Sequence, residues 1–159
     1  MALDTLLGCR LLDKIEFMNT FLQIFKRTLV IFISIFSGAM LNGTLVNVSK
    51  RIIPPPTGFD LSKLEGLQAA MSHMEPKHFL FPFLAHALGT LLSAVMIARF
   101  LRSQQLIFSM MAGILFLMGG VSMVIMLPET PIWFVLLDLL GAYIPMAYLG
   151  YKIGFRPMG

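Results

Sequence analysis

Residues 79–98 read FLFPFLAHALGTLLSAVMIA, a run that contains no Asp, Glu, Lys or Arg. A helix needs about 20 mostly apolar residues to cross the hydrocarbon core of a bilayer. Three further apolar runs of similar length occur at residues 28–49, 106–127 and 131–151. The sequence therefore predicts an all-α fold, a bundle of four transmembrane helices.

The composition of the chain agrees with this fold class. Of 159 residues, 57% are hydrophobic and 13% are charged, whereas a soluble domain carries about 25% charged residues. The length suits one compact domain. The net charge of +4 forms no basic stripe, because the basic residues lie between the spans and at the ends. We therefore exclude nucleic acid as a partner and expect the lipid bilayer.

The basic residues also predict the orientation of the chain. Of 12 Lys and Arg residues, eight lie in the N-terminal arm, the second connection and the C-terminal end, and four lie in the first loop. Loops that stay in the cytoplasm carry an excess of Lys and Arg. We therefore expect both termini in the cytoplasm and residues 50–78 as a long outer loop.

The first part of the chain, residues 1–27, is predicted to be an amphipathic arm that precedes the transmembrane domain of residues 28–159. Its apolar residues recur at helical spacing. They are Leu7, Leu11, Ile15, Met18, Leu22 and Phe25. Such an arm either lies on the inner membrane face, extends the first span, or packs on the bundle or on a partner.

The outer loop is expected to contain a short helix. Ser62 and Glu65 fit a capping box, apolar residues follow at helical spacing, and Pro76 is predicted to end the helix. This helix either acts as a lid over the outer mouth of the bundle or simply covers the end of the bundle. The second interpretation is preferred.

Three strongly polar residues lie inside the predicted spans. Asn42, His86 and Asp138 are each seven residues from the outer end of their span, which puts all three about 10 Å below that edge at 1.5 Å per residue. A carboxylate in hydrocarbon costs about 2.5–3.5 kcal/mol or more, so Asp138 must face the interior, pair or be protonated. His86 is the predicted partner, with Asn42 at its second ring nitrogen and Thr90 on the same helix face.

Small residues and a proline accompany this polar layer. Ser34 with Gly38, and Gly89 with Ser93, follow the small-xxx-small spacing that lets helices approach closely in lipid. Pro145 in the fourth span cannot donate a hydrogen bond and is expected to kink that helix and free a carbonyl one turn earlier. Such kinks occur both in cavities and in purely structural helices.

Two features of the sequence bear on metal binding. His73, Glu75 and His78 lie close together before the second span, but Pro76 breaks any helix that would align them, so a solvated loop is preferred to a metal site. Cys9 is the only cysteine, which excludes an internal disulfide and a multi-thiolate site. We predict no metal and no cofactor, because no haem or phosphate-loop motif occurs.

Four strings of the sequence carry a resemblance. They are residues 54–60 (PPPTGFD), residues 78–90 (HFLFPFLAHALGT), Gly119-Gly120, and residues 131–146, which contain PIWF, Asp138 and AYIPM. Over residues 28–152 the chain resembles a group of small, uncharacterised bacterial membrane proteins with four predicted spans. The resemblance implies a bacterial inner membrane location and adds no catalytic residue.

Three functions are compatible with these observations. The first is a non-enzymatic integral membrane protein, an accessory or assembly-forming subunit that contacts other membrane subunits or further copies of itself, with the polar cluster as a structural clamp. The second is a small proton-linked ligand-binding or transport protein that uses His86, Asp138, Asn42 and Thr90. The third is a membrane enzyme acting on a lipid or quinone, with His86 as its base.

Overall fold

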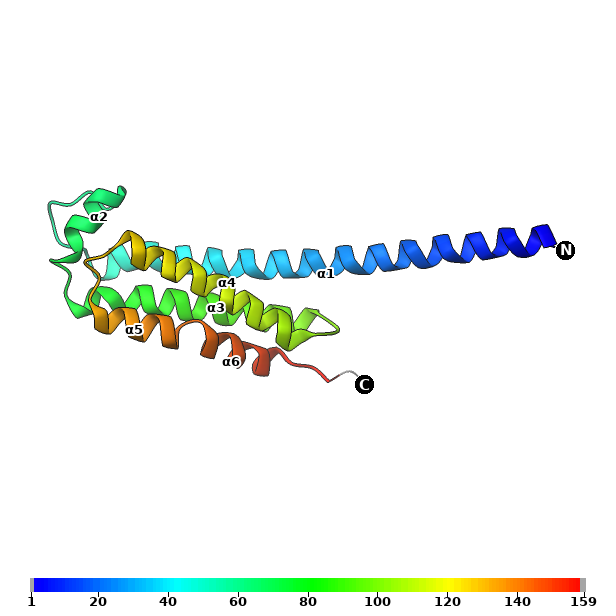
Figure 1. Ribbon diagram of the computed structural model, residues 1–159. Coiled ribbons are helices and arrows are strands. Elements are labelled where there is room, and N and C mark those ends of the chain that lie inside the picture. The colour runs from blue at the N-terminus through cyan, green and yellow to red at the C-terminus, as the bar shows by residue number, and fades with distance from the viewer. Residues whose placement is uncertain (1, 158–159) are drawn as a thin grey trace.

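The computed structural model describes the backbone of residues 2–157, and the side chains of residue 10 and residues 14–157. The chain is all-α, and no strand occurs in the described residues. Its elements are α1 (Ala2–Ile52), α2 (Leu64–Met71), the 3-10 helix η1 (Pro76–Phe79), α3 (Leu80–Phe100), α4 (Gln105–Met126), α5 (Ile132–Gly141) and α6 (Ile144–Gly154). Figure 1 shows α3, α4 and the α5–α6 pair packed together along one part of α1.

Four helical segments are long and apolar enough to cross a membrane: Lys14–Ile52, Pro76–Phe100, Gln105–Met126 and Ile132–Gly154. These segments cover the four predicted spans except for Leu127 and Pro131, each at one end of its span. Their outer surface is strongly apolar, with Ile125 75% and Leu140 72% exposed. An apolar surface of this kind is expected to face lipid rather than water.

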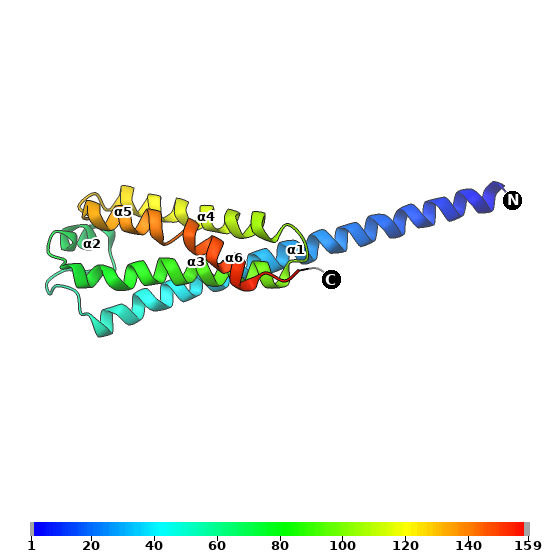
Figure 2. The ribbon, with the colours of Figure 1, turned by 90° about the horizontal axis from the view of Figure 1, so that it is seen from below.

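The first helix, α1, runs from Ala2 to Ile52 without a break. At 1.5 Å per residue its 51 residues extend over about 75 Å, more than twice the ~30 Å of a hydrocarbon core. Its N-terminal half projects beyond the bundle (Figures 1 and 2). The N-terminal arm is therefore a direct continuation of the first span. The side chains of Leu7 and Leu11 lie outside the described set.

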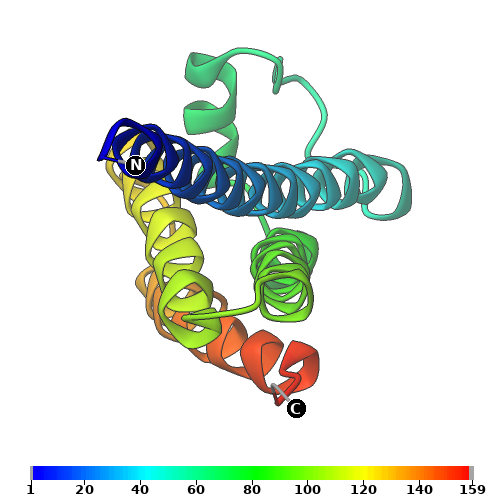
Figure 3. The same ribbon diagram turned by 90° about the vertical axis from the view of Figure 1, so that its right-hand side faces the viewer.

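The central helix of the bundle is α3, which packs against α1, α4 and α6 and lies among them in the end-on view of Figure 3. Glycines allow the close approach. A Cβ on Gly89 would lie 2.7 Å from the carbonyl oxygen of Gly38 on α1, and a Cβ on Gly150 of α6 would lie 2.7 Å from that of Leu91. The predicted Ser34–Gly38 and Gly89–Ser93 faces thus meet in the α1–α3 contact.

The outer-loop helix α2 is present, but its predicted ends are wrong. Lys63, not Ser62, precedes its first residue, and no side chain caps it. The hydroxyl and amide of Ser62 instead donate to Asp60 Oδ1, and these hydrogen bonds hold the pKa of the Asp60 carboxyl below its ordinary value. The helix ends at Met71, and Pro76 begins η1 because proline suits the first turn of a helix.

The fourth span consists of two helices rather than one kinked helix. The break falls at Ala142 and Tyr143, directly before α6, in which Pro145 occupies the first turn. Proline has no amide hydrogen and would clash with the carbonyl of Gly141 in a continuous helix. The interruption predicted from Pro145 is therefore present, and it is larger than a kink.

Candidate functional site

The polar residues of α3 and α5 form a buried pair. Nδ1 of His86 lies 2.8 Å from Oδ1 and 2.9 Å from Oδ2 of Asp138. The side chain of Asp138 is 5% exposed and that of His86 is 21% exposed. An ionised carboxylate can only accept hydrogen bonds, so Nδ1 donates to it when Asp138 is charged. The structure thus brings together the two residues that the sequence places at one depth in separate spans.

Tyr143 is the third member of this cluster. Its hydroxyl donates to Oδ2 of Asp138 at 3.0 Å, and its ring stacks on the imidazole of His86 with ring centres 5.6 Å apart. Tyr143 is 1% exposed. The carboxylate therefore accepts from two buried donors, which compensates for its removal from water.

The break between α5 and α6 makes this contact possible. In a continuous helix, two residues five apart point about 140° away from each other, since each residue turns the helix by about 100°. Asp138 lies in the last turn of α5, and Tyr143 lies in the break itself. Gly120 of α4 leaves the space for the ring, because a Cβ there would lie 2.7 Å from Cζ of Tyr143.

The two other predicted site residues do not contact the pair in the same way. Thr90 is fully buried and its hydroxyl donates to the carbonyl oxygen of His86, one turn earlier in the same helix. Asn42 packs with its Cβ 3.2 Å from the Cβ position of Gly89. Among the described residues, the Asn42 side chain makes no hydrogen bond to His86, because this part of α1 faces the glycine of α3 rather than the imidazole.

A cavity of about 220 Å³ lies above the pair. His86 and Asp138 line it together with apolar residues of α1, α3, α4 and α5, and Leu67 and Met71 of α2 line it from the outer loop. Met71 also packs with Phe79, Leu127 and Phe134, and Gln68 of α2 donates to the carbonyl oxygen of Met126 at 2.7 Å. The short helix α2 therefore covers this end of the bundle (Figure 1).

The two ring nitrogens of His86 differ in their hydrogen bonding. Nδ1 faces the carboxylate, whereas Nε2 makes no hydrogen bond to any described residue. A neutral imidazole that donates through Nδ1 accepts through Nε2, and a protonated one donates through both. The cavity is mostly apolar, and its polar lining residues are few: His86, Asp138, Ser49, Lys50, His78 and Thr130. A mostly apolar cavity with a few polar groups is the usual form of a small-molecule site.

The outer-loop residues His73, Glu75 and His78 do not form a metal centre within the described residues. The ring of His73 packs against Phe59 with centres 5.1 Å apart. Glu75 pairs with Lys77 at 3.0 Å. Nδ1 of His78 accepts from the Glu75 amide at 3.0 Å, so this imidazole helps to fix the start of η1.

Sequence reasoning missed Tyr143. A signal was present, since a tyrosine inside a predicted span needs a partner for its hydroxyl, and Pro145 lies two residues later. The kink expected near Gly141 did not by itself indicate that the side chain of Tyr143 would point toward Asp138.

Comparison of the chain with protein-family models, curated proteins and solved structures found no match. The described residues share one feature with the group that the sequence resembles, namely four candidate membrane spans.

Proposed function

We propose that this chain is an integral membrane protein that binds a small, largely apolar ligand in the cavity above His86 and Asp138, with binding linked to a proton on the pair. The observation that carries the proposal is an imidazole that contacts a buried carboxylate through Nδ1 and has no hydrogen-bond partner for Nε2 among the described residues. Ionisable groups inside membrane spans are functional candidates by default.

The size of the cavity limits the ligand. An apolar protein cavity of about 150 Å³ accommodates benzene, so about 220 Å³ suits a molecule the size of two fused aromatic rings. Apolar side chains of the cavity would contact such a ring system. A hydroxyl or carbonyl group on the ligand would form a hydrogen bond with Nε2 of His86, and this bond would orient the ligand in the cavity.

A matched pair of probes tests this proposal. The fluorescent compound 1-naphthol and its parent hydrocarbon naphthalene differ only in one hydroxyl group. We expect His86→Leu to weaken binding of 1-naphthol to the purified protein by about 2- to 10-fold, the value of one hydrogen bond, and to leave naphthalene unchanged. His73→Leu is the control, because His73 lies outside the cavity.

Two outcomes would contradict the proposal. One is equal weakening of both probes by His86→Leu, which would mean that only shape is lost. The other is binding of 1-naphthol with the same pH dependence in Asp138→Asn as in the parent, because a proton-linked site needs the carboxylate. Purified Asp138→Asn should be folded, since Asn can still accept from His86 and Tyr143.

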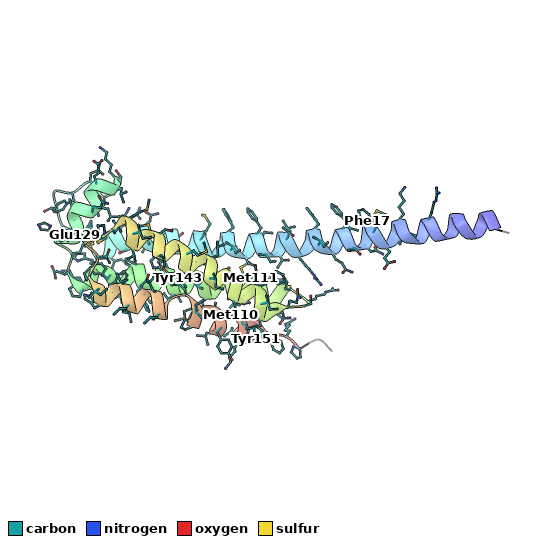
Figure 4. All side chains as sticks on the ribbon, viewed as in Figure 1. Phe17, Met110, Met111, Glu129, Tyr143 and Tyr151 are labelled. Atoms are coloured by element: carbon teal, nitrogen blue, oxygen red, sulfur yellow. The ribbon has the colours of Figure 1, made fainter. Side chains whose placement is uncertain are left out.

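A second proposal concerns assembly, and the observation that favours it is the projecting arm of α1. Phe17 is 75% and Phe21 59% exposed, and Figure 4 shows Phe17 on the part of α1 beyond the bundle. Ile15, Met18, Leu22, Phe25 and Leu29 are also exposed and follow one another at alternating spacings of three and four residues. This spacing is typical of helices that pair in a coiled coil.

We therefore also propose that copies of the chain associate through α1. Light scattering of the detergent-solubilised protein should give a mass above that of one chain, and Phe25→Asn should reduce it. Phe17→Asn is the matched control, because Phe17 is exposed on the same arm but does not belong to the stripe. A parent protein that is monomeric under native-like lipid conditions would exclude this proposal.

The proposed location is the inner membrane of a bacterium, with both termini in the cytoplasm. The supporting observation is that most Lys and Arg residues lie at the end of the bundle that carries the α3–α4 connection and the C-terminus. The variants Lys63→Cys and Lys152→Cys test the orientation. A thiol reagent that cannot cross the membrane should label position 63 from the outside and position 152 only from the cytoplasmic side.

A further inference from the structure

A second groove, of about 710 Å³, lies where α1 passes the connection between α3 and α4. Three cationic side chains line it, Lys26 and Arg27 from α1 and Arg102 from the connection. The amides of Asn19 and Gln23 also line it, and its other lining residues are Leu22, Leu29, Val30, Phe100 and Leu101. No Asp or Glu contributes to the lining, so within the described chain the groove carries positive charge only.

The groove lies at the level where two candidate spans end. Helix α3 ends at Phe100 and α4 begins at Gln105, and the charged headgroups of a bilayer lie at such helix ends. Two features shape the short connection. Gln104 adopts a left-handed conformation with φ of 56°, and the side-chain amide of Gln105 donates to the carbonyl oxygen of Leu101 at 2.9 Å. Arg102 is thereby held beside α1.

Charge and position together identify the ligand chemistry. Arginine presents a planar set of donors that matches phosphate oxygens, and amides of Asn and Gln add further donors. Apolar residues beside these donors would contact acyl chains. Basic pockets between membrane helices favour anionic lipid headgroups.

We propose that the groove between α1 and the α3–α4 connection binds the headgroup of an anionic phospholipid. The phosphate lies among Lys26, Arg27 and Arg102, and the acyl chains run along Val30 of α1 and along Phe100 and Leu101 at the end of α3, outside the stripe proposed for pairing. A zwitterionic lipid fits less well, because its own cation meets the same three positive side chains. This site is separate from the cavity above His86 and Asp138 and lies at the opposite end of the bundle.

The test uses the full-length protein purified in a neutral detergent. Phosphatidylglycerol and phosphatidylcholine with the same acyl chains are added separately, and native mass spectrometry measures the bound fraction of each. We expect phosphatidylglycerol to bind preferentially, and Arg102→Gln and Lys26→Gln each to weaken it by about five-fold, the effect of one basic residue near a lipid surface. Lys14→Gln is the matched control, because it removes the same charge from the same arm but does not line the groove.

Three results would overturn the proposal. The first is equal binding of the two lipids. The second is a loss in Lys14→Gln as large as that in Arg102→Gln, which would show a general effect of net charge. The third is displacement of phosphatidylglycerol by millimolar inorganic phosphate, which would assign the groove to a free anion. Unchanged thermal unfolding of the variants without added lipid shows that the substitutions act on binding.

Discussion

Gly120 of α4 lies directly against the ring of Tyr143, the residue at the break between α5 and α6. A Cβ at position 120 would lie 2.7 Å from Cζ of Tyr143 and 3.0 Å from its Cε2. The hydroxyl of Tyr143 in turn donates to Asp138, and its ring stacks on His86. The absence of a side chain on one helix therefore determines where the phenol, the carboxylate and the imidazole meet.

Gly120→Ala is expected to lower the free energy of unfolding by about 1–3 kcal/mol, the usual effect of overpacking. The Tyr143 ring would have to shift to admit the added methyl group, although its hydroxyl is hydrogen-bonded to Asp138 and the residue is 1% exposed. The neighbouring Gly119 has nothing within 4 Å of its Cβ position, so Gly119→Ala should be neutral or slightly stabilising, since alanine favours helix. Unfolding curves of both variants in the same detergent make the comparison, and equal curves would contradict the close contact.

Tyr143→Phe removes one hydrogen bond and keeps the ring. We expect a loss of about 0.5–1.5 kcal/mol, because Asp138 loses one of two buried donors while the packing against Gly120 remains. Tyr148→Phe is the control, since Tyr148 is 45% exposed. Thermal unfolding distinguishes the two variants, and an unchanged Tyr143→Phe protein would show that the hydroxyl contributes nothing to stability.

The α1–α3 contact depends on Gly38, whose Cβ position meets the backbone carbonyl of Gly89. A backbone atom cannot move aside as a flexible side chain does, so Gly38→Ala should separate the two helices and lower stability by about 1–3 kcal/mol. Gly43→Ala, on the same helix, has nothing within 4 Å of its Cβ position and serves as the control. Equal unfolding of the two variants would mean that α1 is not held at this contact.

The His86–Asp138 contact predicts the position of the imidazole proton. Nδ1 should carry hydrogen whenever Asp138 is ionised, because an ionised carboxylate only accepts hydrogen bonds. Nitrogen NMR of histidine-labelled protein measures this directly, and the exposed His73 provides a reference ring in the same sample. A His86 ring that is protonated only at Nε2 would contradict the arrangement described here.

The four spans were predictable because the hydrocarbon core imposes its length and polarity on any helix that crosses it. The meeting of His86 and Asp138 was also foreseen, since residues at one depth in neighbouring spans have few other polar partners. The contact expected between Asn42 and the second ring nitrogen of His86 is not present, and Asn42 packs against Gly89 instead. Depth is a property of sequence position along a span, whereas the direction of a side chain depends on how each helix is rotated against its neighbour.

The fold class, the approximate spans and the depth of the polar residues follow from the amino-acid order alone, because apolar length and charge placement are local properties of the chain. Three other features are visible only in the folded chain: Tyr143 completes the cluster, Gly120 and Gly38 are contact points while Gly119 and Gly43 are not, and Lys26, Arg27 and Arg102 share one groove. Each of these depends on helix rotation and on the break at residues 142–143, and these result from the packing of all helices together.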